Sequence, residues 1–263
     1  MRKVLTALFI IFESISAIAA EIDSVWLSAT YHVVLKRRAE KGVEESQATL
    51  DIGHKRSTFY NAQNRRFEYL RDSLSRAKAG IAGKVSLLTG DKAPNNKMRY
   101  EVYKNYPEAG KLFYTEHIDK WKFHYNEDMP QIDWQLESED SLVCGYSCMK
   151  AVGELRGRTW TVWYTLDIPV EEGPWKLCGL PGLILQASES RGEFKFICVK
   201  ISNVSAALTL EDEDMIECSP KKLQDELTAF WKDQSKWTLE RQGIPSLGPP
   251  RYTFTPCFIE YYK

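Results

Sequence analysis

Residues 159–166 read Thr-Trp-Thr-Val-Trp-Tyr-Thr-Leu, a run of β-branched, aromatic and aliphatic side chains. Such residues favour strands, and the period-two alternation of a strand places Trp160, Val162, Tyr164 and Leu166 on one face. We assign that face to the protein core. Trp163 lies on the opposite face, where it could stack on a ligand or be covered by a helix or loop.

Similar short runs surround this stretch on both sides. Upstream, Thr30–Lys36 reads as a strand and Ala48–Tyr60 as further extended chain with a bulge or turn at Gly53. Because no long helical pattern separates the later runs, we expect neighbouring strands to pair antiparallel. These later runs are Arg99–Lys104, Lys111–Ile118, Lys122–Tyr125, Asp133–Glu137, Cys144–Val152, Thr159–Leu166, Leu183–Ala187 and Glu193–Ile201.

Two segments show helical periodicity instead. Apolar residues recur at three- and four-residue steps over residues 62–79, and a second helix is predicted from a cap at Ser219 to Gly243. Arg251–Tyr261 is predicted to form a last strand. The expected fold class is mainly β (α+β): a curved antiparallel sheet or incompletely closed barrel with two packed helices.

The N-terminus has the pattern of an export signal. Arg2 and Lys3 precede an apolar stretch, and Ala17-Ile18-Ala19 supplies small residues for a signal peptidase. We therefore expect residues 1–19 to be a cleaved signal peptide and residues 20–263 to form a single β-rich domain, periplasmic or secreted. Glu13 interrupts the apolar stretch, which is shorter than the roughly 20 residues of a membrane span. No other long apolar stretch occurs, so we expect no membrane span in the mature chain.

Charge and cysteine content narrow the possible partners. The formal net charge of −1 gives no electrostatic reason to expect a nucleic-acid partner. Six cysteines in an exported chain predict disulfides, with 15 possible pairings that the spacing does not resolve. No closely spaced Cys or His pair suggests a metal site, and no motif implies a cofactor.

A motif near the middle of the chain carries a family resemblance. Residues 173–185 read Gly-Pro-Trp-Lys-Leu-Cys-Gly-Leu-Pro-Gly-Leu-Ile-Leu, and Gly179–Ile184 spells the string after which the GLPGLI family is named. The chain resembles that family, which consists of exported proteins mainly from the Bacteroidetes and has no assigned function. The resemblance brings no active site. The motif residues are Gly173, Pro174, Gly179, Leu180, Pro181, Gly182, Leu183 and Ile184.

The motif itself favours a structural role. Leu180-Pro181-Gly182-Leu183 suits a type II turn in which Gly182 takes a positive φ. Leu183 then begins a buried strand, and Gly173-Pro174 forms an earlier turn that directs Trp175 into the core. The alternative is that the two turns form the rim of a pocket, with Trp175 and Lys176 facing a ligand.

Arg156 and Arg158 flank the strand at residues 159–166. Their planar guanidinium groups could bind an anion, or they could pair at the surface with Asp167 or Glu154. The candidate ligand-binding residues are thus Arg156, Arg158, Trp163, Trp175 and Lys176.

No catalytic motif is present: the chain contains no G-x-S-x-G, H-E-x-x-H or P-loop pattern. The preferred hypothesis is therefore a non-catalytic envelope protein that binds an apolar or amphipathic ligand. An interaction partner of an outer-membrane assembly ranks second. A hydrolase with an unrecognised site ranks third and predicts a concave cluster of carboxylates with Arg156 or Arg158 and Trp163.

Overall fold

The computed structural model describes residues 20–77, 97–210, 214–245, 248 and 253–262. The predicted signal peptide, residues 1–19, lies outside the described residues. The strands are β1 (Ala20–Leu35), β2 (Glu44–Gly53), β3 (Ser57–Tyr60), β4 (Tyr100–Lys104), β5 (Lys111–Ile118), β6 (Trp121–Asp128), β7 (Gln135–Val143), β8 (Tyr146–Leu155), β9 (Arg158–Thr165), β10 (Leu183–Glu189), β11 (Phe194–Leu210) and β12 (Met215–Glu217).

These strands form one sheet in the order β12-β6-β5-β4-β3-β2-β1-β11-β10-β9-β8-β7. Every pairing is antiparallel except that of β12 with β6, which is parallel. The sheet does not close into a barrel, because β12 and β7 remain its two edges. The predicted fold class is confirmed.

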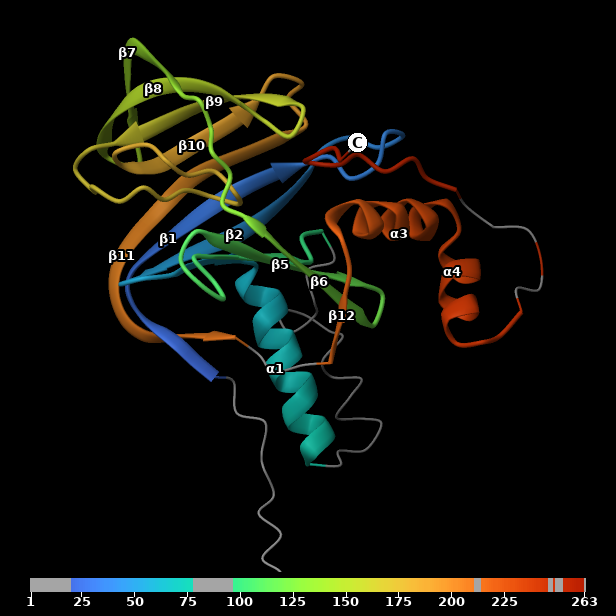
Figure 1. Ribbon diagram of the computed structural model, residues 1–263. Coiled ribbons are helices and arrows are strands. Elements are labelled where there is room, and N and C mark those ends of the chain that lie inside the picture. Colours follow the sequence, from blue (N-terminus) through green and yellow to red (C-terminus); the bar gives the residue numbers. More distant parts are fainter. Residues whose placement is uncertain (1–19, 78–96, 211–213, 246–247, 249–252, 263) are drawn as a thin grey trace, which may run out of the picture.

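Irregularities in the two longest strands account for the strong curvature of the sheet. The pairing of β1 with β11 shifts register at three places, and β-bulges of this kind bend a strand. Both strands arch along one side of the molecule, so that β7–β10 lie above the half of the sheet that contains β5 and β6 (Figure 1). The inner face of the curved sheet encloses the core.

The core follows from alternation along the strands. In β1, Val25, Leu27, Ala29, Tyr31, Val33 and Leu35 are buried, whereas the residues between them are partly exposed. Trp160, Val162 and Tyr164 of β9 are buried as predicted. Leu166 lies beyond the end of β9 and is exposed, so alternation no longer applies to it.

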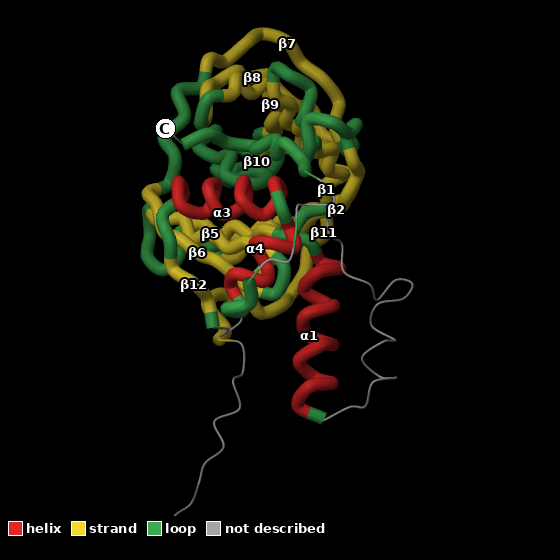
Figure 2. The backbone as a smooth tube through the Cα atoms, turned by 90° about the vertical axis from the view of Figure 1, so that its right-hand side faces the viewer, coloured by secondary structure: helices red, strands yellow, loops and turns green. Residues whose placement is uncertain are grey.

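The described residues contain three helices: α1 (Ala62–Arg76), α3 (Pro220–Lys232) and α4 (Gln234–Arg241). Arg65 of α1 pairs with Glu101 of β4 at 2.9 Å. Helix α3 lies across the gap between the two halves of the sheet, below β7–β10 and beside β5 and β6 (Figure 2). We call residues 253–262, which follow the helices, the C-terminal segment.

Two predicted elements near the C-terminus are wrong. The single helix expected after Ser219 is two helices, because Asp233 leaves the helical conformation and its side chain caps α4 by accepting from the Lys236 amide. The expected strand at Arg251–Tyr261 does not form over its described residues. That chain instead makes an isolated bridge between Pro256 and Arg38 and further contacts with α3 and the β8–β9 turn.

Candidate functional site

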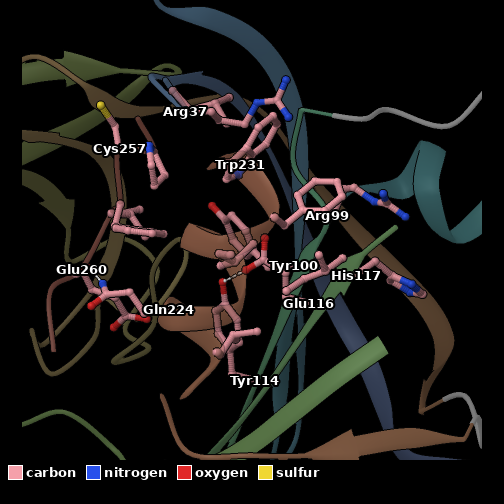
Figure 3. A pocket seen from close by; sticks show the side chains of 18 of the residues that line it. Arg37, Arg99, Tyr100, Tyr114, Glu116, His117, Gln224, Trp231, Cys257 and Glu260 are labelled. Atoms are coloured by element: carbon pink, nitrogen blue, oxygen red, sulfur yellow. Dashed lines mark hydrogen bonds between the residues drawn. The ribbon is translucent and has the colours of Figure 1, made fainter. Parts of the chain in front are cut away.

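A cavity of about 520 Å³ lies between the inner face of the sheet, α3 and the C-terminal segment (Figure 3). Its floor is polar and aromatic and comes from β4, β5 and β6. Its rim carries basic residues that follow β1 or precede β4. An apolar wall completes it, formed by residues of α3 and the C-terminal segment: Leu223, Leu227, Phe230, Trp231, Phe258 and Ile259.

Three tyrosines on neighbouring strands form the floor. The rings of Tyr100 (β4) and Tyr114 (β5) stack with centroids 5.7 Å apart, and those of Tyr114 and Tyr125 (β6) stack at 4.9 Å. We call these residues the tyrosine stack. Burial raises the pKa of all three hydroxyls, so each remains a neutral hydrogen-bond donor at pH 7.

Glu116 lies beside this stack, directly opposite Tyr100 in the β4–β5 pairing. The Glu116 side chain is half-buried: one part of it lines the cavity, and protein atoms enclose the rest. This burial raises the pKa of its carboxyl to about 7, although a hydrogen bond from the Tyr114 hydroxyl at 2.8 Å acts in the opposite direction. Among the described residues, the Glu116 carboxyl forms no ion pair.

The basic residues of the rim are engaged elsewhere. Arg37 and Arg38 both pair with Glu44, at 2.6 and 3.0 Å, and both guanidinium groups lie over the Trp231 ring. Arg99 donates to the backbone carbonyl of Asp119 at 2.6 Å. The rim thus carries positive charge that is already partnered by protein groups.

Strand alternation separates Glu116 from its neighbour His117. The Glu116 side chain points toward the middle of the cavity, whereas the tips of Arg99 and His117 point away from it (Figure 3). His117 borders a second, smaller pocket against α1, and burial lowers the pKa of its imidazole to about 3. The imidazole is therefore neutral at pH 7 and faces the outer side of the sheet.

None of the five residues predicted to bind a ligand lines the cavity, but Lys176 contacts three residues that do. Its Nζ is 2.8 Å from both carboxyl oxygens of Glu260, 2.5 Å from Glu127 Oε1, 2.8 Å from the Tyr125 hydroxyl and 3.0 Å from that of Tyr262. Tyr125, Glu260 and Tyr262 line the cavity, but Lys176 itself is 1% exposed. Protein groups therefore surround the Lys176 ammonium.

Arg156 and Arg158, for which anion binding and carboxylate pairing were the two alternatives, both pair with carboxylates. Arg158 is buried and pairs with Glu189 and Glu193, each at 2.8 Å. Arg156, in the turn between β8 and β9, pairs with Glu127 at 2.7 Å. The alternative partners considered from the sequence, Asp167 and Glu154, are not the ones used.

The two predicted tryptophans also lie away from the cavity. Trp175 is fully buried, with its ring centroid 5.6 Å from that of Trp160. Trp163 is half-buried on the other face of β9 and packs against the edge of the core. The concave cluster of carboxylates, Arg156 or Arg158 and Trp163 that the hydrolase hypothesis predicts is therefore absent from the cavity lining.

The motif residues pack between β9 and β10. Leu180, Leu183 and Ile184 are buried, and the Lys104 ammonium holds the preceding loop by donating to the Gly173 and Leu177 carbonyls. Pro174 begins the predicted turn there, since its carbonyl accepts from the Leu177 amide. None of the motif residues lines the cavity.

The predicted type II turn at Pro181-Gly182 is wrong in its backbone conformation. Gly179, not Gly182, has the positive φ, of 86°. Gly182 is needed for a different reason: a Cβ there would lie 2.0 Å from the Thr165 carbonyl oxygen. Close approach of two backbone segments, and not turn geometry, requires glycine at this position.

The structure also corrects the predicted disulfides, because all six cysteines are free thiols. Cys144 lies in the two-residue turn between β7 and β8, not on one strand with Cys148 as expected. Its thiol lies near enough to that of Cys198 to act on it electrostatically, while Cys178, Cys218 and Cys257 lie on separate segments. No cluster of three or more His, Cys, Asp or Glu residues in the described ranges could hold a metal ion.

Sequence reasoning missed the residues that form the cavity floor. One signal was present: on the β5 face that carries Leu112, Tyr114 and Ile118, alternation also places Glu116. A carboxylate on an otherwise apolar strand face is a candidate functional group. The sequence did not show which surface lies opposite Glu116, because α3 and the C-terminal segment approach β5 only in the folded chain.

Comparisons with known proteins give one family match. Residues 152–186 match a family described as "Protein of unknown function (Porph_ging)". This range covers the end of β8, β9, the motif loop and the start of β10, and it includes Gly179–Ile184. The comparison with curated proteins gave no match.

Two solved proteins show distant similarity. Structures of PNGF-II in the C2 and P21 space groups each give a TM-score of 0.49 and 16% identity, over 78% and 77% of this chain and 32% of PNGF-II. The crystal structure of MucB in complex with MucA(peri) gives a TM-score of 0.27 and 10% identity, over 74% of this chain and 56% of the other. The chain thus spans about a third of the length of PNGF-II, and neither similarity indicates a function.

Proposed function

We propose that this chain is an exported protein of the cell envelope that binds a small amphipathic molecule in the cavity between β4–β6, α3 and the C-terminal segment. The main observation that supports this proposal is the size and lining of the cavity. Its volume of about 520 Å³ lies within the roughly 300–1,000 Å³ of small-molecule sites. Its lining combines an apolar wall with a few convergent polar groups, as such sites do.

The division of the lining determines the kind of ligand. Side chains of α3 and the C-terminal segment offer aliphatic and aromatic surface to a hydrocarbon portion. The tyrosine stack and Glu116, on the opposite side, offer hydrogen bonds to a polar group. A molecule with one apolar and one polar end would satisfy both sides, whereas a purely apolar ligand would leave the polar floor without partners.

The family assignment and the export of the chain form part of the same proposal. The string Gly179–Ile184 lies inside the range that matches the Porph_ging family, which supports placing the chain in the GLPGLI group. Export rests on the N-terminal sequence. Intact-mass analysis of protein recovered from the envelope fraction should give a chain that begins at Ala20; recovery of the uncleaved precursor alone would contradict export.

Binding can be tested with the fluorescent probe N-phenyl-1-naphthylamine. Leu227→Trp enlarges a side chain of the cavity wall, and we expect it to weaken probe binding at least tenfold. Ala229→Trp places the same side chain on the exposed face of α3 and should leave the affinity unchanged. Native mass spectrometry of gently purified protein should also show a bound small molecule.

The test has a clear negative outcome. If the probe binds equally to both variants and no molecule accompanies the purified protein, the cavity is not a ligand site. The result would then favour the alternative role as an interaction partner of an outer-membrane assembly, which pull-down from envelope extracts would test.

A further inference from the structure

Glu116 is an acid that lines the cavity and forms no ion pair with any described residue. We propose that the cavity binds an amphiphile carrying an ammonium group, and that Glu116 is the counter-ion of that group. This inference rests on the proposed binding function and specifies the chemical class of the ligand. It requires that no protein cation already neutralises Glu116, and that the surroundings of Glu116 suit an ammonium group.

Arg99 and Arg37 favour the ionised form of Glu116 electrostatically, but neither forms an ion pair with it, because their guanidinium groups contact other partners. Arg37 and Arg38 are bound to Glu44, and Arg99 donates to the Asp119 carbonyl with its guanidinium directed away from Glu116 (Figure 3). In the described part of the chain, the only hydrogen bond to the Glu116 carboxyl comes from the Tyr114 hydroxyl. A carboxylate so enclosed gains most from a partner of opposite charge.

The second requirement is supported by how the protein binds its own ammonium group. Lys176 Nζ lies 5.0 Å from the Tyr114 ring centroid and 5.1 Å from that of Tyr125, and Glu260 supplies the charge. Aromatic faces together with a carboxylate are a favourable environment for a cation. The protein thus places its own ammonium group beside Tyr114 and Tyr125, where the Tyr125 hydroxyl accepts from it at 2.8 Å.

Tyr100 and Tyr114, together with Glu116, offer tyrosine rings and a carboxylate to the cavity. Tyr100 stacks on Tyr114 on the side away from Tyr125, and Glu116 faces Tyr100 across the β4–β5 pairing. Tyr100, Tyr114 and Glu116 all line the cavity. A ligand ammonium there would have two aromatic rings and a carboxylate, with its hydrocarbon chain directed to Leu227 and Phe230.

The charged and titratable groups around Glu116 come from four segments. They are Tyr114 on β5, Tyr100 and Arg99 on or next to β4, Arg37 after β1, and Glu260 in the C-terminal segment. Since the carboxyl must be ionised to pair with an ammonium, binding should strengthen as the pH rises from 5.5 to 8. An alkylammonium remains protonated over this range, so the pH dependence reports on the protein.

The experiment compares three probes of equal chain length: decylamine, decanol and decanoate, each titrated calorimetrically into the protein. At pH 8 we expect decylamine to bind at least tenfold more tightly than decanol, and to lose about tenfold in affinity at pH 5.5. Glu116→Gln should reduce decylamine to the affinity of decanol and leave decanol unchanged. Glu240→Gln, which removes an exposed carboxylate on α4, should change nothing.

The outcomes separate this inference from the proposed function. If decanol or decanoate binds best, or if Glu116→Gln keeps the preference for decylamine, the ammonium assignment is overturned while cavity binding stands. If none of the three probes binds the unaltered protein, both fail. Near-ultraviolet circular dichroism of Glu116→Gln confirms that the variant retains the native tertiary structure.

Discussion

At the scale of single residues, Glu116 is a cavity acid whose protonation differs between the folded and the unfolded chain. The other residues on the inner face of β5 are aromatic or aliphatic, whereas Glu116 carries a carboxyl. Burial raises the pKa of this carboxyl from an ordinary value near 4.5 to about 7. The folded protein therefore keeps a proton on Glu116 that the unfolded chain releases near pH 4.5. Glu116 therefore lowers the free energy of unfolding at pH values above about 4.5.

Glu116→Gln should remove this effect. Between about pH 4.5 and pH 7 the unfolded chain binds fewer protons at this position than the folded one, so the free energy of unfolding falls as the pH rises. The variant lacks this dependence. Relative to the unaltered protein, we expect it to gain about 3 kcal/mol of stability at pH 8 compared with pH 4, because each unit of pKa difference between the folded and unfolded chain corresponds to about 1.4 kcal/mol. Urea unfolding at both pH values measures this; an equal effect at both would contradict the assigned burial.

At the scale of secondary-structure elements, the motif loop between β9 and β10 is defined by close backbone packing. Gly182 allows its own backbone to contact that of Thr165, and Gly173 lies against Ile184 and the Leu177 carbonyl. The Leu183 amide donates to the Ile168 carbonyl at 3.0 Å, which joins the two ends of the loop. The close backbone contacts at the start of β10 therefore account for the glycines of the motif without any ligand.

Gly182→Ala should therefore destabilise the protein strongly. The added Cβ would lie 2.0 Å from a backbone oxygen that cannot rotate away, so strands β9 and β10 would have to separate. We expect a loss of more than about 3 kcal/mol in the free energy of unfolding. Gly42→Ala, where an added Cβ meets nothing within 4 Å, is the matched control and should be nearly neutral. Equal stability of the two variants would disprove the packing argument.

At the scale of the whole molecule, the buried Lys176 connects three segments that are distant in sequence. Its ammonium joins the motif loop to Glu127 at the end of β6 and to Glu260 in the C-terminal segment. Because the C-terminal segment also forms part of the cavity wall, this contact holds the wall against the sheet. Among the described residues, none of the helices has the length and hydropathy of a membrane span.

Lys176→Met should loosen this arrangement. It leaves the carboxylates of Glu127 and Glu260 enclosed without the cation between them, and removing one partner of a buried ion pair costs about 3–5 kcal/mol. Lys221→Met, which breaks an exposed pair with Asp225, should cost less than about 0.5 kcal/mol. Thermal unfolding of both variants checks the difference. A similar melting temperature for the two variants would show that the ion pairs of Lys176 do not stabilise the protein more than an exposed pair does.

Much of the strand content could be predicted because it is local. The predicted bounds of Lys111–Ile118 agree with those of β5, and the alternation of Trp160, Val162 and Tyr164 identified the buried face of β9. Elements with weak local signals were missed. The short β12 forms only through parallel pairing with β6, and the helix break at Asp233 depends on a cap that the apolar pattern does not reveal.

The sequence by itself determined the mainly β fold, the burial of the motif and the pattern expected of an exported chain, because strand alternation, turn residues and an N-terminal apolar stretch act over a few neighbouring residues. The tertiary structure decided the cavity, the pairing of Lys176, Arg156 and Arg158 with their carboxylates, and the absence of disulfides. Each of these depends on contacts between segments that lie far apart in the chain. The bends of β1 and β11 bring those segments together. Sequence patterns over a few neighbouring residues do not show which distant segments will meet in the folded chain.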